Sequence, residues 1–159
     1  MLKELPPSAV VVPRWIAIAL GEIGVRENPA RGVSNPRIEQ YHAVTSAGEA
    51  LDDVPWCSSF VCWCMEMAGV ASTRSKAAAS WSQWGVDCTR GFGCIIVFGK
   101  HDKDARGTGH VGFCLGTTGH EVFVLGGNQK QRVGIDVRDA RKIVTWRWPE
   151  AVQLPKATS

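Results

Sequence analysis

A chain of 159 residues, 45% of them hydrophobic and 21% charged, has the size and composition of one globular domain with a sizeable core. This mixture excludes disordered and collagen-like chains, and a net charge of +3 spread over scattered basic residues excludes the concentrated basic surface of a nucleic-acid-binding protein. The longest hydrophobic run, AVVVPRWIAIALGEIG, is interrupted by Pro13 and Arg14. We therefore expect neither an integral membrane segment nor a signal peptide.

The first half of the chain has the pattern of helices. Residues 1–12 contain two adjacent prolines and predict an extended lead-in. Apolar residues three and four positions apart then recur, with Asn-Pro or Pro at the starts and glycine at most of the ends. The predicted helices cover residues 13–24, 35–41, 56–69 and 75–85. The third is the best defined, because one of its sides is apolar throughout.

From residue 93 the pattern changes to short strands separated by glycine-bearing turns. The predicted strands cover residues 94–98, 110–115, 121–125, 133–137 and 143–148. Helices followed by an antiparallel meander predict an α+β fold, with the N-terminal helices packed on an antiparallel sheet of about five to six strands. No repeat or second domain is indicated, so we predict one domain over residues 1–159, with its core at 13–150 and a tail at 151–159.

The cysteines do not indicate a metal site. Four of the six lie in apolar runs and are predicted to be buried free thiols: Cys62, Cys64, Cys94 and Cys114. Cys88 and Cys94 flank a short loop and could alternatively pair under oxidising conditions. Cys62 and Cys64 are two positions apart on a helix, which points their sulfurs about 200° apart and argues against zinc. Residues 102–104 lack the glycine and glutamate of a calcium loop. We expect no metal and no cofactor.

Cys57 stands at the start of the third predicted helix, in the stretch DVPWCSSFVCWCMEMAG. The first turn of a helix has unpaired N–H groups and a positive dipole end, which lower the pKa of a thiol and favour the nucleophilic thiolate. The competing interpretation is a small core residue, since most cysteines of globular proteins are buried and inert. A catalytic role for Cys57 therefore requires a partner base.

His110 is the candidate base, because it follows a glycine-flanked loop and opens an apolar strand, where a side chain is both rigid and accessible. The segments VGFCLG and EVFVLGG predict a hairpin around Thr118, which places His110 opposite residues 126–128. The side-chain carbonyl of Asn128 would then accept a hydrogen bond from the imidazole and fix its orientation. A slip of one residue in the register would turn Asn128 to the other face.

Cys, His and Asn in this order form the arrangement of papain-like cysteine peptidases. The segments PWCSSFVCWCMEMAG, GHVGF and VLGGNQ, together with a terminal RWP, resemble the CHAP and NlpC-type cysteine amidases and peptidases, particularly the single-domain forms often found in phage and prophage lysis genes. The resemblance extends from about Trp15 to Pro149. It implies a papain-like fold for this chain.

The resemblance also implies a function. The protein would hydrolyse peptidoglycan at an amide bond, either within the stem or bridge peptides or between muramic acid and the first alanine. Cys57 would be the nucleophile, His110 the general base and then acid, and Asn128 the orienting residue, with the N–H of Cys57 in the oxyanion hole. We expect a monomer that is made in the cytoplasm and acts in the periplasm or cell wall. An antibacterial effector of the same chemistry and an inactive wall-binding protein are the alternatives.

Substrate contacts are assigned to five residues near these positions: Tyr41, Trp56, Ser58, Trp81 and Gln129. Aromatic side chains suit the walls of a groove that binds glycans or peptides, and core packing is the alternative. Papain has a glutamine before its cysteine as a second oxyanion donor, whereas residues 51–53 are Leu, Asp and Asp here. Tyr41 is the candidate for that donor, because NlpC-type enzymes have a tyrosine upstream, with a role in helix packing as the alternative.

Overall fold

The computed structural model describes residues 11–88, 91–99 and 109–155. Most of the predicted lead-in (residues 1–10), the segment tested for a calcium loop (residues 102–104) and the end of the tail (residues 156–159) lie outside the described residues.

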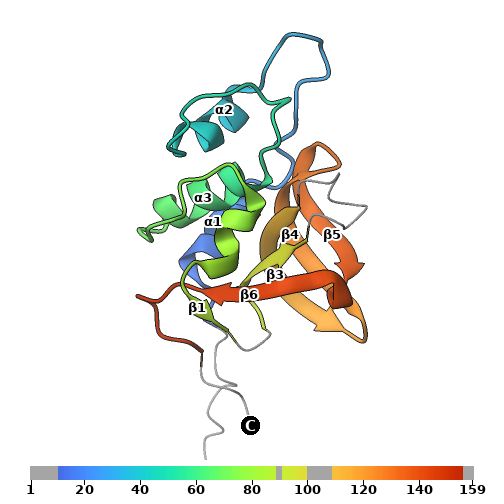
Figure 1. The fold of residues 1–159 in the computed structure, drawn as a ribbon. Helices are drawn as coiled ribbons and strands as arrows, with labels where there is room; N and C mark the ends of the chain where they lie inside the picture. The colour runs from blue at the N-terminus through green and yellow to red at the C-terminus, as the bar shows by residue number, and fades with distance from the viewer. Residues whose placement is uncertain (1–10, 89–90, 100–108, 156–159) are drawn as a thin grey trace, which may run out of the picture.

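The helices of the described residues agree with the four predicted segments (Figure 1). They are α1 (Arg14–Gly21), α2 (Pro36–Ala43), α3 (Cys57–Met67) and the 3-10 helix η1 (Ala78–Gln83). The Asn35 side chain accepts a hydrogen bond from the Arg37 N–H, which caps the start of α2. The predicted segment at residues 75–85 contains a short 3-10 helix, in keeping with its three serines and two tryptophans, which favour a long α-helix less than alanine does.

The strands form one antiparallel sheet, which confirms the predicted α+β class. They are β1 (Val86–Asp87), β2 (Ile95–Phe98), β3 (His110–Thr118), β4 (Glu121–Gln129), β5 (Arg132–Asp139) and β6 (Ile143–Trp148). The order in the sheet is β1-β6-β2-β3-β4-β5, and the short 3-10 helix η3 (Ala140–Lys142) connects β5 to β6. Strand β1 was not predicted, because two residues are too few to show an alternation of polar and apolar side chains.

The core lies between the helices and the sheet (Figure 1). Helix α3 packs on β3 and β4, where the rings of Phe60 and Phe113 lie 6.5 Å apart. Trp15 of α1 meets Trp148 of β6 edge to face at 5.0 Å, and its Nε1 donates a hydrogen bond to the carbonyl of Gly93. The first and last elements of the described chain are thereby joined, and α3 is held centrally between α1, α2 and the sheet.

The cysteines follow the sequence-based prediction with one exception. Cys62, Cys64 and Cys114 are buried free thiols, as predicted. Cys94 is not free, because it forms the disulfide with Cys88 that the sequence analysis gave as the alternative. The two residues directly follow β1 and directly precede β2, and these strands flank β6 in the sheet. The pairing across β6 brings the two cysteines together, which the spacing in the sequence does not show.

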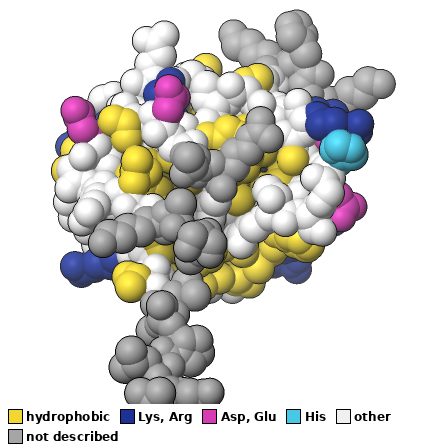
Figure 2. Space-filling view, turned by 90° about the horizontal axis from the view of Figure 1, so that it is seen from below, with side chains coloured by type: hydrophobic (Ala, Val, Ile, Leu, Met, Phe, Trp, Pro, Cys, Tyr) yellow, Lys and Arg dark blue, Asp and Glu magenta, His cyan; other side chains and the backbone are white. Residues whose placement is uncertain are grey.

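Figure 2 shows the molecule from below, where hydrophobic side chains gather near the middle of the face and charged side chains lie around its periphery. Both positive and negative side chains lie around this periphery, in keeping with the small net charge of +3. None of the helices in the described part of the chain has the length and hydrophobicity needed to cross a membrane.

Candidate active site

Cys57 is the first residue of α3, as predicted. The capping residue Trp56 makes no side-chain hydrogen bond to the helix, so a side-chain cap does not occupy the N–H groups of the first turn. This turn is anchored by the next residue instead. The hydroxyl of Ser58 donates to the carbonyl of Ser75 at 2.6 Å and accepts a hydrogen bond from Trp81 Nε1 at 2.9 Å. These two hydrogen bonds tie the residue next to Cys57 to the segment that contains Ser75 and Trp81.

The Cys57 side chain is 6% exposed, and its burial raises the pKa of the thiol above the usual value. Hydrogen bonds from the backbone N–H groups of Val111 and Ser58, and the charge of Arg138, act in the opposite direction but do not outweigh burial. The N–H groups at the helix start lower the pKa of this thiol in the predicted direction, but the cost of desolvating a thiolate outweighs them. The contact with the N–H of Val111 places the sulfur beside the first residues of β3.

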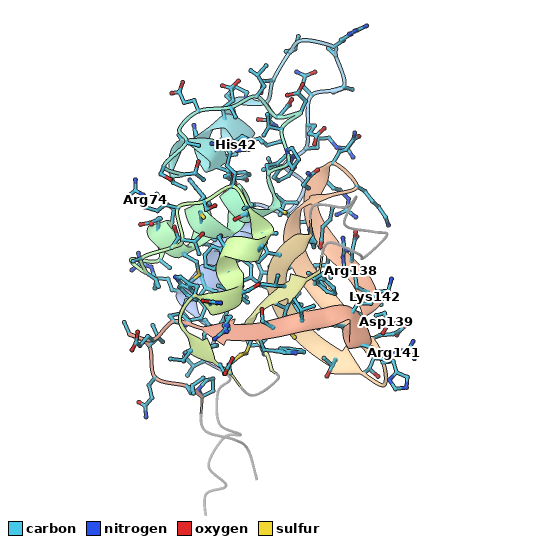
Figure 3. All side chains as sticks on the ribbon, viewed as in Figure 1. His42, Arg74, Arg138, Asp139, Arg141 and Lys142 are labelled. Carbon is cyan, nitrogen blue, oxygen red and sulfur yellow. A yellow bond between two sulfur atoms is a disulfide. The ribbon has the colours of Figure 1, made fainter. Side chains whose placement is uncertain are left out.

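His110 is the first residue of β3 and is 4% exposed. Since Val111 follows it directly, the structure brings the predicted nucleophile and the predicted base to the same end of the sheet. The His110 ring also lies 6.1 Å from the ring of Phe98 on the neighbouring strand β2. The other described histidines lie elsewhere. His42 is on α2, above α3 in the view of Figure 3, and His120 is exposed in the turn between β3 and β4.

The side chain that contacts the His110 ring is that of Gln129, with 2.9 Å between Gln129 Oε1 and His110 Nε2. The predicted contact with Asn128 is replaced because β4 contains an irregularity between Gly126 and Gln129, where the register with β5 shifts by one residue. Asn128 lies in this bulge with a φ of 55°. The hairpin was predicted correctly, and the bulge exchanges the faces of the two neighbouring side chains.

The glycines of the GGNQ segment explain why this arrangement fits. A Cβ atom on Gly126 would lie 3.0 Å from Gln129 Oε1 and 3.5 Å from His110 Nε2. A Cβ atom on Gly127 would lie 2.6 Å from Phe60 Cβ and 2.7 Å from Trp56 Cζ3. The two glycines therefore leave room for the imidazole partner and for the start of α3. The Gly-Gly pair is the signal in the sequence that the backbone passes close to other groups here.

Arg138 on β5 is a residue of this region that the sequence analysis did not identify. Its guanidinium carbon lies 5.3 Å above the ring of Phe98, and its charge favours the thiolate of Cys57. Figure 3 shows Arg138 on the strand side of the molecule, near Asp139. No local pattern distinguishes Arg138 from Arg132, the other basic residue of β5, because the effect of its charge on Cys57 arises only in the folded chain.

Three of the predicted substrate-contact residues are fully buried: Tyr41, Trp56 and Trp81 are each 0% exposed. The Tyr41 hydroxyl donates to Glu22, the residue that directly follows α1, so its hydrogen is used within the protein. Trp56 Nε1 donates to Glu27 at 2.9 Å, and Trp81 Nε1 to the Ser58 hydroxyl. These aromatic side chains hold α3 in place and do not form the walls of a groove.

The side chains of the other two predicted substrate-contact residues form hydrogen bonds within the protein. The Ser58 hydroxyl is buried between Ser75 and Trp81, and Gln129 is 1% exposed against His110. Among the residues that the structure describes, no group of three or more His, Cys, Asp or Glu side chains is arranged to hold a metal ion.

Comparison with models of known protein families matches residues 50–128 to the CHAP domain. The matched segment begins shortly before α3, includes Cys57 and His110, and ends in the bulge of β4. A search of curated proteins finds no match to this chain.

Proposed function

Because this chain belongs to the CHAP domain family, we propose that it is a cysteine peptidase or amidase that hydrolyses an amide bond of bacterial peptidoglycan. Membership of the family suggests peptidoglycan hydrolysis, and the observation that supports a thiol mechanism is the position of Cys57. Its sulfur lies at the start of a helix and against the N–H of Val111, next to His110. A thiol and an imidazole at one end of a sheet are the parts that thiol-dependent acyl transfer requires.

In this mechanism His110 takes the thiol proton as the sulfur attacks the carbonyl carbon of the scissile amide. A proton transfer at the moment of attack suits the burial of Cys57, which disfavours a resting thiolate. The backbone N–H of Cys57 donates to the oxyanion of the tetrahedral intermediate, a contribution of about 3 kcal/mol for one donor. His110 then protonates the leaving amine, and water hydrolyses the thioester with His110 again as the base.

We propose a phage or prophage endolysin as the biological role, since the resemblance of the sequence motifs to single-domain lysis proteins supports it. The site of action would be the periplasm or cell wall. The disulfide between Cys88 and Cys94 is compatible with an oxidising compartment of this kind. Both the stem-peptide bond and the bond between muramic acid and alanine present the same carbonyl group to the sulfur, so the bond must be identified by experiment.

The test is digestion of purified peptidoglycan and of outer-membrane-permeabilised Gram-negative cells. We expect the wild-type protein to clear the suspension, and mass spectrometry of the fragments to show one newly freed amine and carboxylate per cut. Cys57→Ala and His110→Ala should abolish clearing while the proteins remain folded. Cys62→Ala is the matched control, because it removes a buried thiol from the same helix and should keep most of the activity. Undiminished clearing by Cys57→Ala would refute the proposal.

A further inference from the structure

We propose that Gln129 is the positioning residue of this site, and that it fixes His110 in the tautomer that carries its proton on Nε2. The catalytic consequence of this inference rests on the proposed function, whereas the tautomer itself is a property of the folded chain. The inference depends on the two ends of one carboxamide. One end meets the imidazole ring, and the other meets two backbone carbonyl groups.

The direction of the Gln129 carboxamide follows from the chemistry of its partners. Its Nε2 lies 3.0 Å from the carbonyl oxygen of Val124 and 2.8 Å from that of Gly134. Carbonyl oxygens only accept hydrogen bonds, so both must face the NH₂ group, which has two N–H donors and uses both here. A rotated carboxamide would point its oxygen at two other oxygens in a buried place. The oxygen Oε1 must therefore face His110.

The tautomer of His110 follows from this direction. Oε1 of a carboxamide only accepts, so the facing ring atom, His110 Nε2, must donate and must carry the hydrogen. A neutral imidazole has one N–H group, and its lone pair is then on Nδ1. In the proposed mechanism, Nδ1 takes the proton of the Cys57 thiol. The other tautomer would place two lone pairs opposite each other at 2.9 Å.

Burial strengthens this selection, because Gln129 is 1% exposed and His110 is 4% exposed. Solvent water has little access to compensate for a wrong tautomer or a rotated carboxamide, and an unsatisfied buried polar group costs about 1–3 kcal/mol. The site is also built for a glutamine side chain. Gly126 leaves the space that the carboxamide occupies, and Gly134 on β5 supplies the distal carbonyl. An asparagine at position 129 would be one methylene too short to reach both ends.

A carboxylate would not replace this carboxamide, although a carboxylate often orients a catalytic imidazole. Gln129→Glu would place an oxygen against the carbonyls of Val124 and Gly134, which would lose their donor. The buried acid would have to stay protonated to donate to one of them. We therefore expect Gln129→Glu to lose stability and activity as the pH rises. A site whose activity increased with a negative charge beside the imidazole would show the opposite pH dependence.

The first measurement is spectroscopic and needs no substrate. Long-range proton–nitrogen correlation spectra of the full-length, ¹⁵N-labelled chain distinguish a ring nitrogen that carries hydrogen from one that does not. We expect His110 to show the Nε2–H tautomer at a pH where the ring is neutral, and Gln129→Ala to give a mixture of tautomers. Gln153→Ala, an exposed glutamine outside the site, is the control and should leave the His110 signals unchanged. A wild-type His110 protonated on Nδ1 would overturn the inference.

The second measurement is the rate of peptidoglycan hydrolysis. Gln129→Ala should lower kcat about tenfold or more with little change in KM, since one hydrogen bond of this kind is lost while substrate contacts stay. Asn128→Gly removes the neighbouring amide, and glycine tolerates the positive φ at this position, so kcat should fall clearly less than in Gln129→Ala. A larger loss for Asn128→Gly than for Gln129→Ala would overturn the inference. If the wild-type chain shows the Nε2–H tautomer and hydrolyses no peptidoglycan, only the proposed function fails.

Discussion

The substitution Gly127→Ala provides a sensitive test of how α3 is placed against the end of β4. Gly127 has no positive φ, so alanine introduces no backbone strain at this position and the effect is one of space alone. Its Cβ would lie 2.6 Å from Phe60 Cβ and 2.7 and 2.8 Å from two ring atoms of Trp56. Carbon atoms in contact are normally about 3.5–4.0 Å apart, so the neighbours would have to move by about 1 Å.

These neighbours cannot move independently of the site. Trp56 and Phe60 are each 0% exposed; Trp56 directly precedes Cys57, and Phe60 lies three residues after it in α3. Trp56 is also held by its hydrogen bond to Glu27. Overpacking of this kind costs about 1–3 kcal/mol of folding free energy. At roughly 2–4 °C per kcal/mol for a chain of this size, Tm should fall by several degrees, and Cys57 should be displaced from β3.

The assay is urea unfolding followed by tryptophan fluorescence, together with the rate of peptidoglycan hydrolysis. Gly21→Ala is the matched control, because a Cβ there meets nothing within 4 Å and the position lies in α1. Its stability should be unchanged or higher by up to about 1 kcal/mol, since alanine favours a helix over glycine. A Gly127→Ala protein within about 0.5 kcal/mol of wild type and fully active would refute the packing described here.

Three further predictions concern buried polar groups. Because burial raises the pKa of the Cys57 thiol, its alkylation by iodoacetamide should be slow at neutral pH and should accelerate as the pH rises above about 8.5. Rapid alkylation at pH 6 would instead indicate a resting thiolate and contradict this prediction. Burial, and secondarily the charge of a nearby lysine, lowers the pKa of His42. Below about pH 6.5 the unfolded chain therefore binds a proton that the folded chain does not, and the free energy of unfolding should fall as the pH drops. His42→Gln should flatten that dependence in urea titrations at several pH values, and an unchanged slope would contradict it. Ser58→Ala leaves the Trp81 N–H and the Ser75 carbonyl without their partner and should cost about 1–3 kcal/mol in thermal or urea unfolding, whereas a loss below 0.5 kcal/mol would show that these bonds are replaced.

The parts of this protein that the sequence alone determined are those with a local pattern. Apolar spacing and the residues at its ends located the helices, including the start of α3 at Cys57. Period-two alternation and the turn at Thr118 located the hairpin that places His110 across from the GGNQ segment. These features depend on residues a few positions apart in the chain, so the composition of a short window is enough to predict them.

The tertiary structure decided which of the two neighbouring side chains, Asn128 or Gln129, contacts His110. A shift of one residue in the pairing of β4 with β5 turns Gln129 to His110 in place of Asn128, and no local pattern reports that shift. The direction of the pKa change at Cys57 also depends on burial by distant segments, which outweighs the local effect of the helix start. In the same way, Tyr41 faces Glu22 because α1 and α2 both pack on α3. Such contacts join residues far apart in the chain, and their energies depend on packing that exists only once the whole sheet and its helices have assembled.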